Sequence, residues 1–294
     1  MQTFVKYILR IMLMLVISAY ALDFFYTNIF EKSLPRTKFQ NLRVLKNQSI
    51  DYVFLGSSRV ENGISPEVIK NKTGKSAMNL GFQASKMSDI YLILQLLDEY
   101  KIKYKKAFIQ VDYIFNIENG FSNVLGYEIL PFIHENELIS NHCQLNDKIN
   151  FWRNKHIPFY RYSIASQKIG IREVFSNLMR KKTPIFENKG YLPLYGNFSG
   201  GNYTLPETIL PKNKYYDLMV NYSLKNKKEI IFFTAPFRIL NNDFSFVQKL
   251  ETKIQGLKNF SNELPHDKYF ENNNHLNNDG AFAFTTILIE KLKL

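Results

Sequence analysis

Short apolar runs that stop at turn residues recur along the chain. The first covers residues 52–55 (Tyr-Val-Phe-Leu) and stops at Gly56. Runs of this length, rich in β-branched and aromatic residues, are typical of buried strands. We expect further strands at residues 77–80, 106–111 and 229–235, the last of which ends at Pro236.

Segments in which apolar residues recur with helical spacing lie between these runs. Residues 87–100 carry such a face, and another helix is expected from Pro66, with Ser65 as its cap, to about residue 71. The other predicted helices cover residues 135–151, 162–179, 215–226, 244–257 and 281–292. Strands that alternate with helices at this spacing predict crossover connections. We therefore expect an α/β fold, a flavodoxin-like three-layer α/β/α sandwich with a mainly parallel sheet.

The N-terminus carries a separate apolar segment. Lys6 and Arg10 precede an uncharged stretch at residues 11–22, and Asp23 follows it. One interpretation is a cleaved signal peptide with Ala19-Tyr-Ala21 as its cleavage site. The other is an uncleaved anchor, because residues 7–26 give roughly the ~20 residues that cross a bilayer. We favour the anchor over the signal peptide, since aromatic residues crowd its distal edge, and over a buried helix, since Lys6 and Arg10 lie on the proximal side only.

The expected domain organisation follows from these segments. Residues 1–30 form the membrane anchor or signal peptide, and residues 31–49 form a polar, basic stalk. Residues 50–294 form the α/β domain, with an insertion at about residues 115–210. Positive charge stays on the cytoplasmic side of a membrane. We therefore expect a single-pass protein of the cytoplasmic membrane whose C-terminal domain is periplasmic or extracellular.

Composition narrows the classes of partner. The net charge is +12, but the basic residues are scattered and no nucleic-acid-binding module is present. An anionic membrane surface or an acidic glycan explains the charge equally well, and a solvated basic surface without a specific partner explains it better. The single cysteine, Cys143, excludes an intrachain disulfide. We expect no nucleic acid, no metal ion and no cofactor.

Two polar segments carry candidate chemistry. Gly56-Ser57-Ser58-Arg59 follows the first predicted strand, at the edge where α/β sheets bind ligands. It is either a polar turn or an exposed nucleophile. His275 lies in a polar loop before the last predicted helix. A serine hydroxyl is a weak nucleophile until a base takes its proton, so the two segments complement each other.

This combination resembles the SGNH (GDSL-like) hydrolase superfamily over roughly residues 50–294. Ser58 matches the nucleophile, with Ser57 in place of the usual Asp, and His275 matches the base. Gly81 matches a glycine whose N–H binds the oxyanion together with the N–H of Ser58. The N-terminal anchor and the segment 190–194 (Gly-Tyr-Leu-Pro-Leu) resemble a membrane-anchored branch related to envelope-polymer acylation proteins.

The chain departs from the family pattern at two places. The residue three positions before the histidine, usually Asp, is Asn272, so Glu271 or Asp267 could substitute, or a Ser–His dyad could act alone. The family's asparagine donor after the third strand is also displaced. Asp112 follows that strand, and Asn116 lies two positions beyond the expected place.

The resemblance implies a serine-dependent acyl-ester hydrolase or O-acyltransferase that acts on acylated envelope or exported polysaccharide. Arg59 would contact an anionic substrate or pair with a surface carboxylate. The alternative is a catalytically inactive SGNH-like protein that binds a membrane-bound acyltransferase. Asn272 and the displaced asparagine favour that alternative, whereas Ser58, Gly81 and His275 together favour the enzyme.

Overall fold

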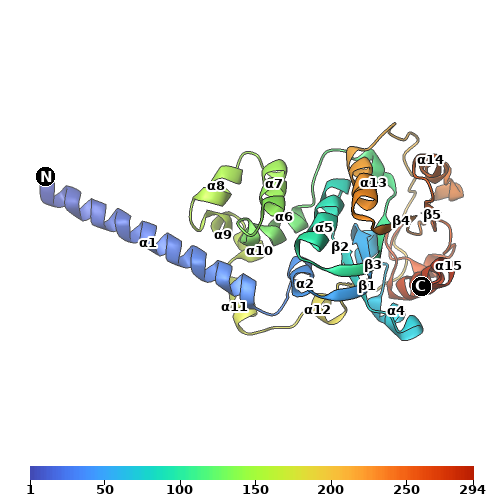
Figure 1. The fold of residues 1–294 in the computed structure, drawn as a ribbon, viewed down its shortest axis with the longest axis horizontal. Coiled ribbons are helices and arrows are strands. Elements are labelled where there is room, and N and C mark those ends of the chain that lie inside the picture. Colours follow the sequence, from blue (N-terminus) through green and yellow to red (C-terminus); the bar gives the residue numbers. More distant parts are fainter. The chain divides into compact units, whose positions relative to one another are not determined.

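The computed structural model describes residues 1–294, except for the side chain of Leu240. The chain divides into two compact units (Figure 1). Unit 1 consists of residues 1–40 and 126–182, and unit 2 consists of residues 41–125 and 183–294. The segment expected as an insertion thus contributes residues 126–182 to the unit that also holds the N-terminal helix.

Unit 2 is built on a five-stranded, all-parallel sheet with the order β2-β1-β3-β4-β5. The predicted α/β fold class is confirmed. The chain moves outward from β1 to β2 and then crosses to β3 on the other side, so β1 and β3 flank the point where the strand order reverses. Ligands bind preferentially at that point in open α/β sheets. The strands are β1 (Ser49–Gly56), β2 (Ala77–Gly81), β3 (Lys103–Gln110), β4 (Glu229–Thr234) and β5 (Lys258–Asn259).

Helices cover both faces of this sheet (Figure 1). On one face α5 (Met87–Glu99) packs beside α13 (Lys214–Asn226), where the Tyr222 hydroxyl donates to the carbonyl of Leu94 at 3.3 Å. On the other face α4 (Pro66–Thr73) and α15 (Asn278–Leu292) pack over the alternate side chains of the strands. There Phe54, Phe108 and Phe284 belong to one buried cluster, as alternation along the strands requires.

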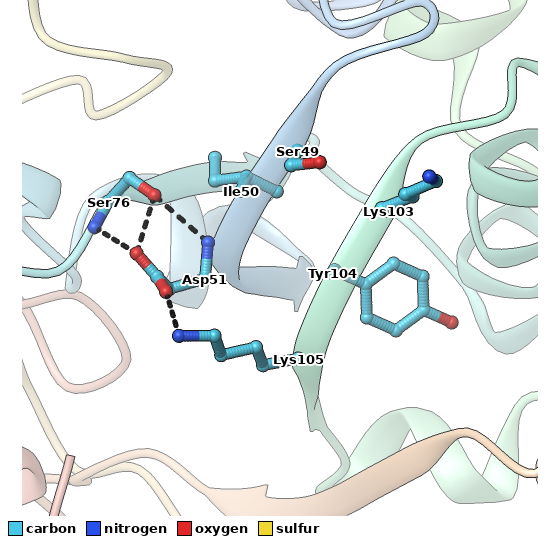
Figure 2. A pocket seen from close by; sticks show the side chains of 7 residues that line it. All are labelled: Ser49, Ile50, Asp51, Ser76, Lys103, Tyr104 and Lys105. Atoms are coloured by element: carbon cyan, nitrogen blue, oxygen red, sulfur yellow. Dashed lines mark hydrogen bonds and ion pairs between the residues drawn. The ribbon is translucent and has the colours of Figure 1, made fainter.

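The amino ends of the strands are joined by a polar cluster (Figure 2). The Asp51 carboxylate on β1 accepts hydrogen bonds from the N–H and hydroxyl of Ser76, both at 2.8 Å, and pairs with Lys105 on β3 at 2.7 Å. These partners lower the pKa of Asp51 well below its usual range. A surface hollow of about 340 Å³ lies there, at the edge of the sheet opposite Ser58.

Several element boundaries differ from the predictions. The last helix begins at Asn278, because the Asn277 side chain caps it by accepting the Gly280 N–H at 2.9 Å. The helix predicted to end at residue 257 ends at Lys253. Strand β5, with two residues, is too short to leave a periodic signal. The predicted helix 135–151 is shorter, because it ends at Asn146 and a separate helix begins at Phe151, and the predicted helix 162–179 is divided into three helices. The remaining elements of unit 2 are α3 (Ser58–Glu61), α12 (Pro184–Glu187), α14 (Ser245–Lys253), η1 (Tyr113–Asn116), η3 (Leu240–Asn242) and η4 (Asp267–Tyr269).

Unit 1 contains the long helix α1 (Gln2–Lys32), whose most apolar 18-residue window has a mean hydropathy of 2.0 and no buried residue. By length and composition this helix is a candidate membrane span, and a signal sequence would meet the same test. Tyr26, Ile29 and Phe30, near its end, are buried in the unit. The other helices of unit 1 are η2 (Leu130–Phe132), α7 (Glu137–Asn146), α8 (Phe151–His156), α9 (Tyr160–Ile164), α10 (Ser166–Ile169) and α11 (Ile171–Leu178). Two helices cross the unit boundary: α2 (Lys38–Val44), in the expected stalk, and α6 (Asn123–Ile129).

Candidate active site

Ser58 begins the short helix α3 directly beyond the carboxyl end of β1. Gln110, at the end of β3, holds the preceding residue, because its Oε1 accepts both the N–H and the hydroxyl of Ser57 at 2.9 Å. Gly56 is required at this turn, since a Cβ there would lie 2.4 Å from Cγ2 of Val60. The end of β1 and Gln110 on the neighbouring strand β3 therefore together hold the turn at which Ser58 lies.

His275 reaches this turn from a sequence position 217 residues away. Its Nε2 lies 2.7 Å from Oγ of Ser58, and its Nδ1 lies 3.0 Å from Oδ1 of Asn272. The Asn272 Oδ1 also accepts the backbone N–H groups of Asn274 and His275, at 2.9 and 3.0 Å, so this atom is the amide oxygen. An acceptor at Nδ1 places the ring proton there and leaves the Nε2 lone pair facing the serine. The geometry is that of a nucleophile, a base and an orienting group.

A carboxylate lies on the far side of Asn272 from the His275 ring. The Asn272 amide nitrogen donates to Oε2 of Glu271 at 2.5 Å. Asp267, the other candidate substitute, pairs with Arg238 instead. The sequence suggested Glu271 as a replacement for Asn272. In the structure it stands behind Asn272 in the order Glu271, Asn272, His275, Ser58.

The imidazole of His275 is kept neutral. Burial first, and the positive charge of Arg59 second, lower the pKa of His275 from 6.5 to about 4. Both effects disfavour the charged ring. At neutral pH the ring is therefore a free base that can accept the proton of Ser58.

Arg59 ties the nucleophile turn to the histidine loop. Its buried guanidinium forms an ion pair with the buried Asp112, and its Nε donates to the carbonyl of Asn274 at 3.2 Å. Nη2 donates to the carbonyls that follow β4, at 2.7 Å to Ala235 and 2.6 Å to Pro236. Of the two roles that the sequence left open for Arg59, the structure shows a pair with a carboxylate, one in the interior and not on the surface.

The two expected oxyanion donors differ in whether their backbone N–H groups already have a hydrogen-bond acceptor. The N–H of Ser58 has no acceptor among the described residues. The N–H of Gly81 donates to Oδ1 of the buried Asn79 at 3.0 Å. A Cβ on Gly81 would lie 2.5 Å from the nitrogen of Glu61, so this glycine also permits β2 and α3 to approach. The Asn116 amide bonds to Thr208 and Leu210, at 2.7 and 3.0 Å.

Sequence reasoning missed Asn79 and Gln110. Asn79 donates to the carbonyls of Val60 and Ile64, at 2.6 and 2.8 Å, and so holds α3 in place. Both residues are fully buried, Asn79 within the apolar strand β2 and Gln110 directly after the apolar residues 107–109 of β3. That position was the available signal, because a buried amide must find hydrogen-bond partners.

A surface hollow of about 290 Å³ adjoins the histidine loop. Asn273, next to Asn272, lines it and accepts the Gly201 N–H at 3.1 Å. The other lining residues are Phe198, Gly201, Arg238, Ile239, Asn241, Asn242 and Asp267. Within the described residues, no group of three or more His, Cys, Asp or Glu side chains could hold a metal ion.

Comparisons with known proteins do not identify a family for this chain. No family model and no curated protein matches the sequence. Among solved structures, one described provisionally as a platelet activating factor from Streptococcus pneumonia matches with 11% identity and a TM-score of 0.37. The match covers 98% of this chain and 99% of the other. At that TM-score the match carries no conclusion about this protein.

Proposed function

We propose that the protein is a serine-dependent acyl-ester hydrolase or O-acyltransferase of the SGNH type. The observation that carries the proposal is the contact of 2.7 Å between Oγ of Ser58 and Nε2 of His275, with Asn272 at the other ring nitrogen. Three residues from two distant segments meet at the sheet edge where ligands bind. A polar turn without a chemical role does not require this alignment.

The proposed reaction has two halves. Oγ of Ser58 attacks the carbonyl carbon of the ester while its proton passes to Nε2 of His275. The oxyanion that forms is stabilised by the N–H of Ser58, and by that of Gly81 if it turns away from Asn79. The C–O bond then breaks, and His275 returns the proton to the leaving alcohol. Water or a sugar hydroxyl next attacks the acyl-serine with the same base, which gives hydrolysis or transfer.

The group behind the base differs from that of a standard triad. An imidazolium forms during each half of the reaction, and Asn272 alone cannot offset its charge. The carboxylate of Glu271, at 2.5 Å from the Asn272 nitrogen, supplies negative charge through that amide. In a serine protease, replacing the triad Asp by Asn lowers kcat about 10⁴-fold, in part through the wrong tautomer. We therefore expect slower turnover than in an enzyme with a carboxylate at this position.

A hydroxyl-rich substrate suits the surroundings of the site. The hollow beside the histidine loop is lined by three asparagines and by Phe198, which offer amide hydrogen bonds and an apolar face. We propose acylated envelope or exported polysaccharide as the substrate. The site would work outside the cytoplasmic membrane, to which α1 anchors the chain.

The test is covalent labelling with a fluorophosphonate and with an activated acetyl ester, read by mass spectrometry on the intact chain. The wild type should gain one adduct, and Ser58→Ala and His275→Ala should lose it. Ser166→Ala is the control, because it removes an exposed serine hydroxyl from unit 1 and leaves the nucleophile turn intact. Absence of a Ser58 adduct with both reagents would contradict the proposal.

A second candidate is a non-catalytic partner of a membrane-bound acyltransferase. It is favoured by the bond of 3.0 Å that engages the Gly81 N–H with Asn79, and by the Asn116 amide, which bonds to Thr208 and Leu210. In that case polymer acylation in cells should survive Ser58→Ala but fail when the chain is deleted. An enzyme predicts loss of acylation, or of deacylation, in both strains.

A further inference from the structure

The distal end of α1 is built into unit 1. Oδ1 of Asp23 pairs with Arg161 at 2.7 Å, and its Oδ2 accepts the N–H of Phe159 at 2.7 Å. The rings of Tyr26 and Phe159 meet edge to face, with centroids 4.9 Å apart. The helix therefore passes without interruption from its exposed apolar part into the folded unit. Asp23 is the first charged residue after Arg10, so it marks the level at which the apolar segment ends.

The chain that leads to Phe159, the residue whose N–H Asp23 accepts, exposes large apolar side chains. In the segment 148–157, Ile149 is 85% exposed and Trp152 is 62% exposed. Lys148 and Arg153 beside them are also exposed. Tryptophan is enriched at membrane–water interfaces, and basic side chains near the surface attract anionic lipid. Exposed apolar and basic side chains thus lie together in the segment that leads to the contact between Phe159 and Asp23, the residue at which the apolar segment ends.

We propose that the segment 148–157 is a second membrane contact. Trp152 and Ile149 enter the boundary between headgroups and acyl chains, and Lys148 and Arg153 bind anionic headgroups. The inference rests on α1 remaining in the bilayer as an anchor. With α1 and this segment both attached, unit 1 cannot rotate about the axis of a single helix.

Another exposed apolar stripe, on α11, provides a contrast within the same unit. Phe175 is 57% exposed, but α11 is tied to the chain beyond α1. Its Asn177 accepts the Ser33 hydroxyl at 2.7 Å, and its Glu173 pairs with Arg36 at 2.5 Å. Ser33 follows Asp23 by ten residues, so α11 is attached roughly 15 Å further along the helix direction at about 1.5 Å per residue. We expect the α11 stripe to stay outside the bilayer.

The chain contains one tryptophan, so Trp152 reports on this segment without labelling. The full chain is reconstituted into vesicles of phosphatidylcholine with one part in about four of phosphatidylglycerol, a composition that supplies anionic surface charge. Some vesicles carry brominated acyl chains that quench nearby tryptophan. We expect bromine near the headgroups to quench Trp152 more than bromine near the chain ends, and aqueous iodide to quench it weakly.

Two variants serve as controls. Leu13→Trp with Trp152→Phe places the probe within the uncharged part of α1, and bromine on the acyl chains should quench it more than bromine near the headgroups. Phe175→Trp with Trp152→Phe places it on α11, where iodide should quench it and bromine should not. Lys148→Glu with Arg153→Glu should reduce bromine quenching of Trp152 in anionic vesicles more than in neutral ones.

Two outcomes would overturn the proposal while α1 remains in the bilayer. One is a Trp152 that iodide quenches and bromine does not, while the Leu13→Trp probe is quenched in the bilayer. The other is a Trp152 shielded in native membranes but open in pure lipid, which would assign the segment to a protein partner. If the Leu13→Trp probe is also open to iodide, α1 is not in the bilayer and the proposal fails with the anchor.

Discussion

Asn272 stands where a carboxylate would complete a triad, and the carboxylate stands next to it. Oδ1 of Asn272 orients His275 through Nδ1 at 3.0 Å, while its Nδ2 contacts Glu271 at 2.5 Å. Orientation and charge, which one Asp would combine, are thus divided between two neighbouring side chains. Exchanging the amide of residue 272 and the carboxylate of residue 271 would place orientation and charge on one side chain, at position 272.

We predict that Glu271→Gln with Asn272→Asp speeds acylation of Ser58 and shifts its pH dependence. In the wild type the labelling rate should rise with pH around 4, where His275 loses its proton. A carboxylate beside Nδ1 favours the imidazolium, so the midpoint should move up toward 6.5 or beyond. At pH 8 the gain should be smaller than the about 10⁴-fold triad Asp-to-Asn loss, because that loss includes the wrong tautomer, which Oδ1 of Asn272 already prevents. An unchanged midpoint in the paired variant would show that Asn272 does not act on the ring.

His275 should also make stability depend on pH. Its pKa is about 4 in the folded state, lower than the ordinary 6.5. Between these values the unfolded chain binds the additional proton, so the free energy of unfolding should fall as pH drops from 6.5 to 4. His275→Gln should show a smaller fall in that window. Denaturant unfolding at several pH values measures the difference, and parallel curves would contradict the expectation.

The turn formed by α3 is held from three strand ends. Asn79 on β2 binds its carbonyls, Gln110 on β3 binds Ser57, and Arg59 reaches the chain beyond β4. Each bond is buried, where an unsatisfied partner is costly. The position of Ser58 therefore depends on residues that have no direct part in the proposed reaction.

Gly81→Ala should displace α3 from β2. The new Cβ would lie 2.5 Å from the nitrogen of Glu61 and 2.8 Å from the carbonyl oxygen of Ser57, and both are backbone atoms. We expect labelling of Ser58 to slow by about 10²-fold, the cost of roughly 1 Å of misplacement. Gly201→Ala is the matched control, because nothing lies within 4 Å of its added Cβ. Equal labelling of both variants would mean that β2 does not position the serine.

Breaking the buried ion pair should destabilise the whole of unit 2. Asp112→Ala leaves the Arg59 guanidinium buried without its carboxylate, which costs about 3–5 kcal/mol. Lys106→Ala removes a half-exposed pair with Glu229 and should cost less than about 1 kcal/mol. The free energy of unfolding in urea measures both changes. A loss below 1 kcal/mol for Asp112→Ala would mean that the pair does not hold the site together.

The molecule as a whole combines an apolar helix with a site in the other unit. If α1 is a span with Lys6 and Arg10 on the cytoplasmic side, the rest of the chain lies across the membrane. That orientation is what an enzyme of envelope polymers requires. It can be tested because the native cysteine is silent: Cys143 is buried, and burial raises the pKa of its thiol to about 12.

We predict opposite labelling of cysteines introduced on the two sides of the expected span. Lys225→Cys, on the exposed side of α13, should react with a membrane-impermeant maleimide in right-side-out vesicles. Gln2→Cys should react only in inverted vesicles. The wild type, with Cys143 alone, controls for background. Labelling of Lys225→Cys only in inverted vesicles would place the C-terminal units in the cytoplasm.

The sequence by itself determined the parallel α/β fold and the apolar N-terminal helix, because both follow from patterns of neighbouring residues. Strand runs of four to eight residues and a long uncharged segment need no distant partner to be recognised. It also indicated Ser58 and His275, whose residue types and neighbours carry a chemical meaning. Boundaries were less exact where a cap such as Asn277 decides where a helix begins.

Only the tertiary structure decided what surrounds the serine. The pairing of Arg59 with Asp112, the engagement of Gly81 by Asn79 and the place of Glu271 behind Asn272 depend on which strand ends meet. Tertiary packing also joined residues 126–182 to the N-terminal helix. Side-chain partners over such separations leave no periodic signal, since one hydrogen bond constrains two positions and leaves the residues between them free.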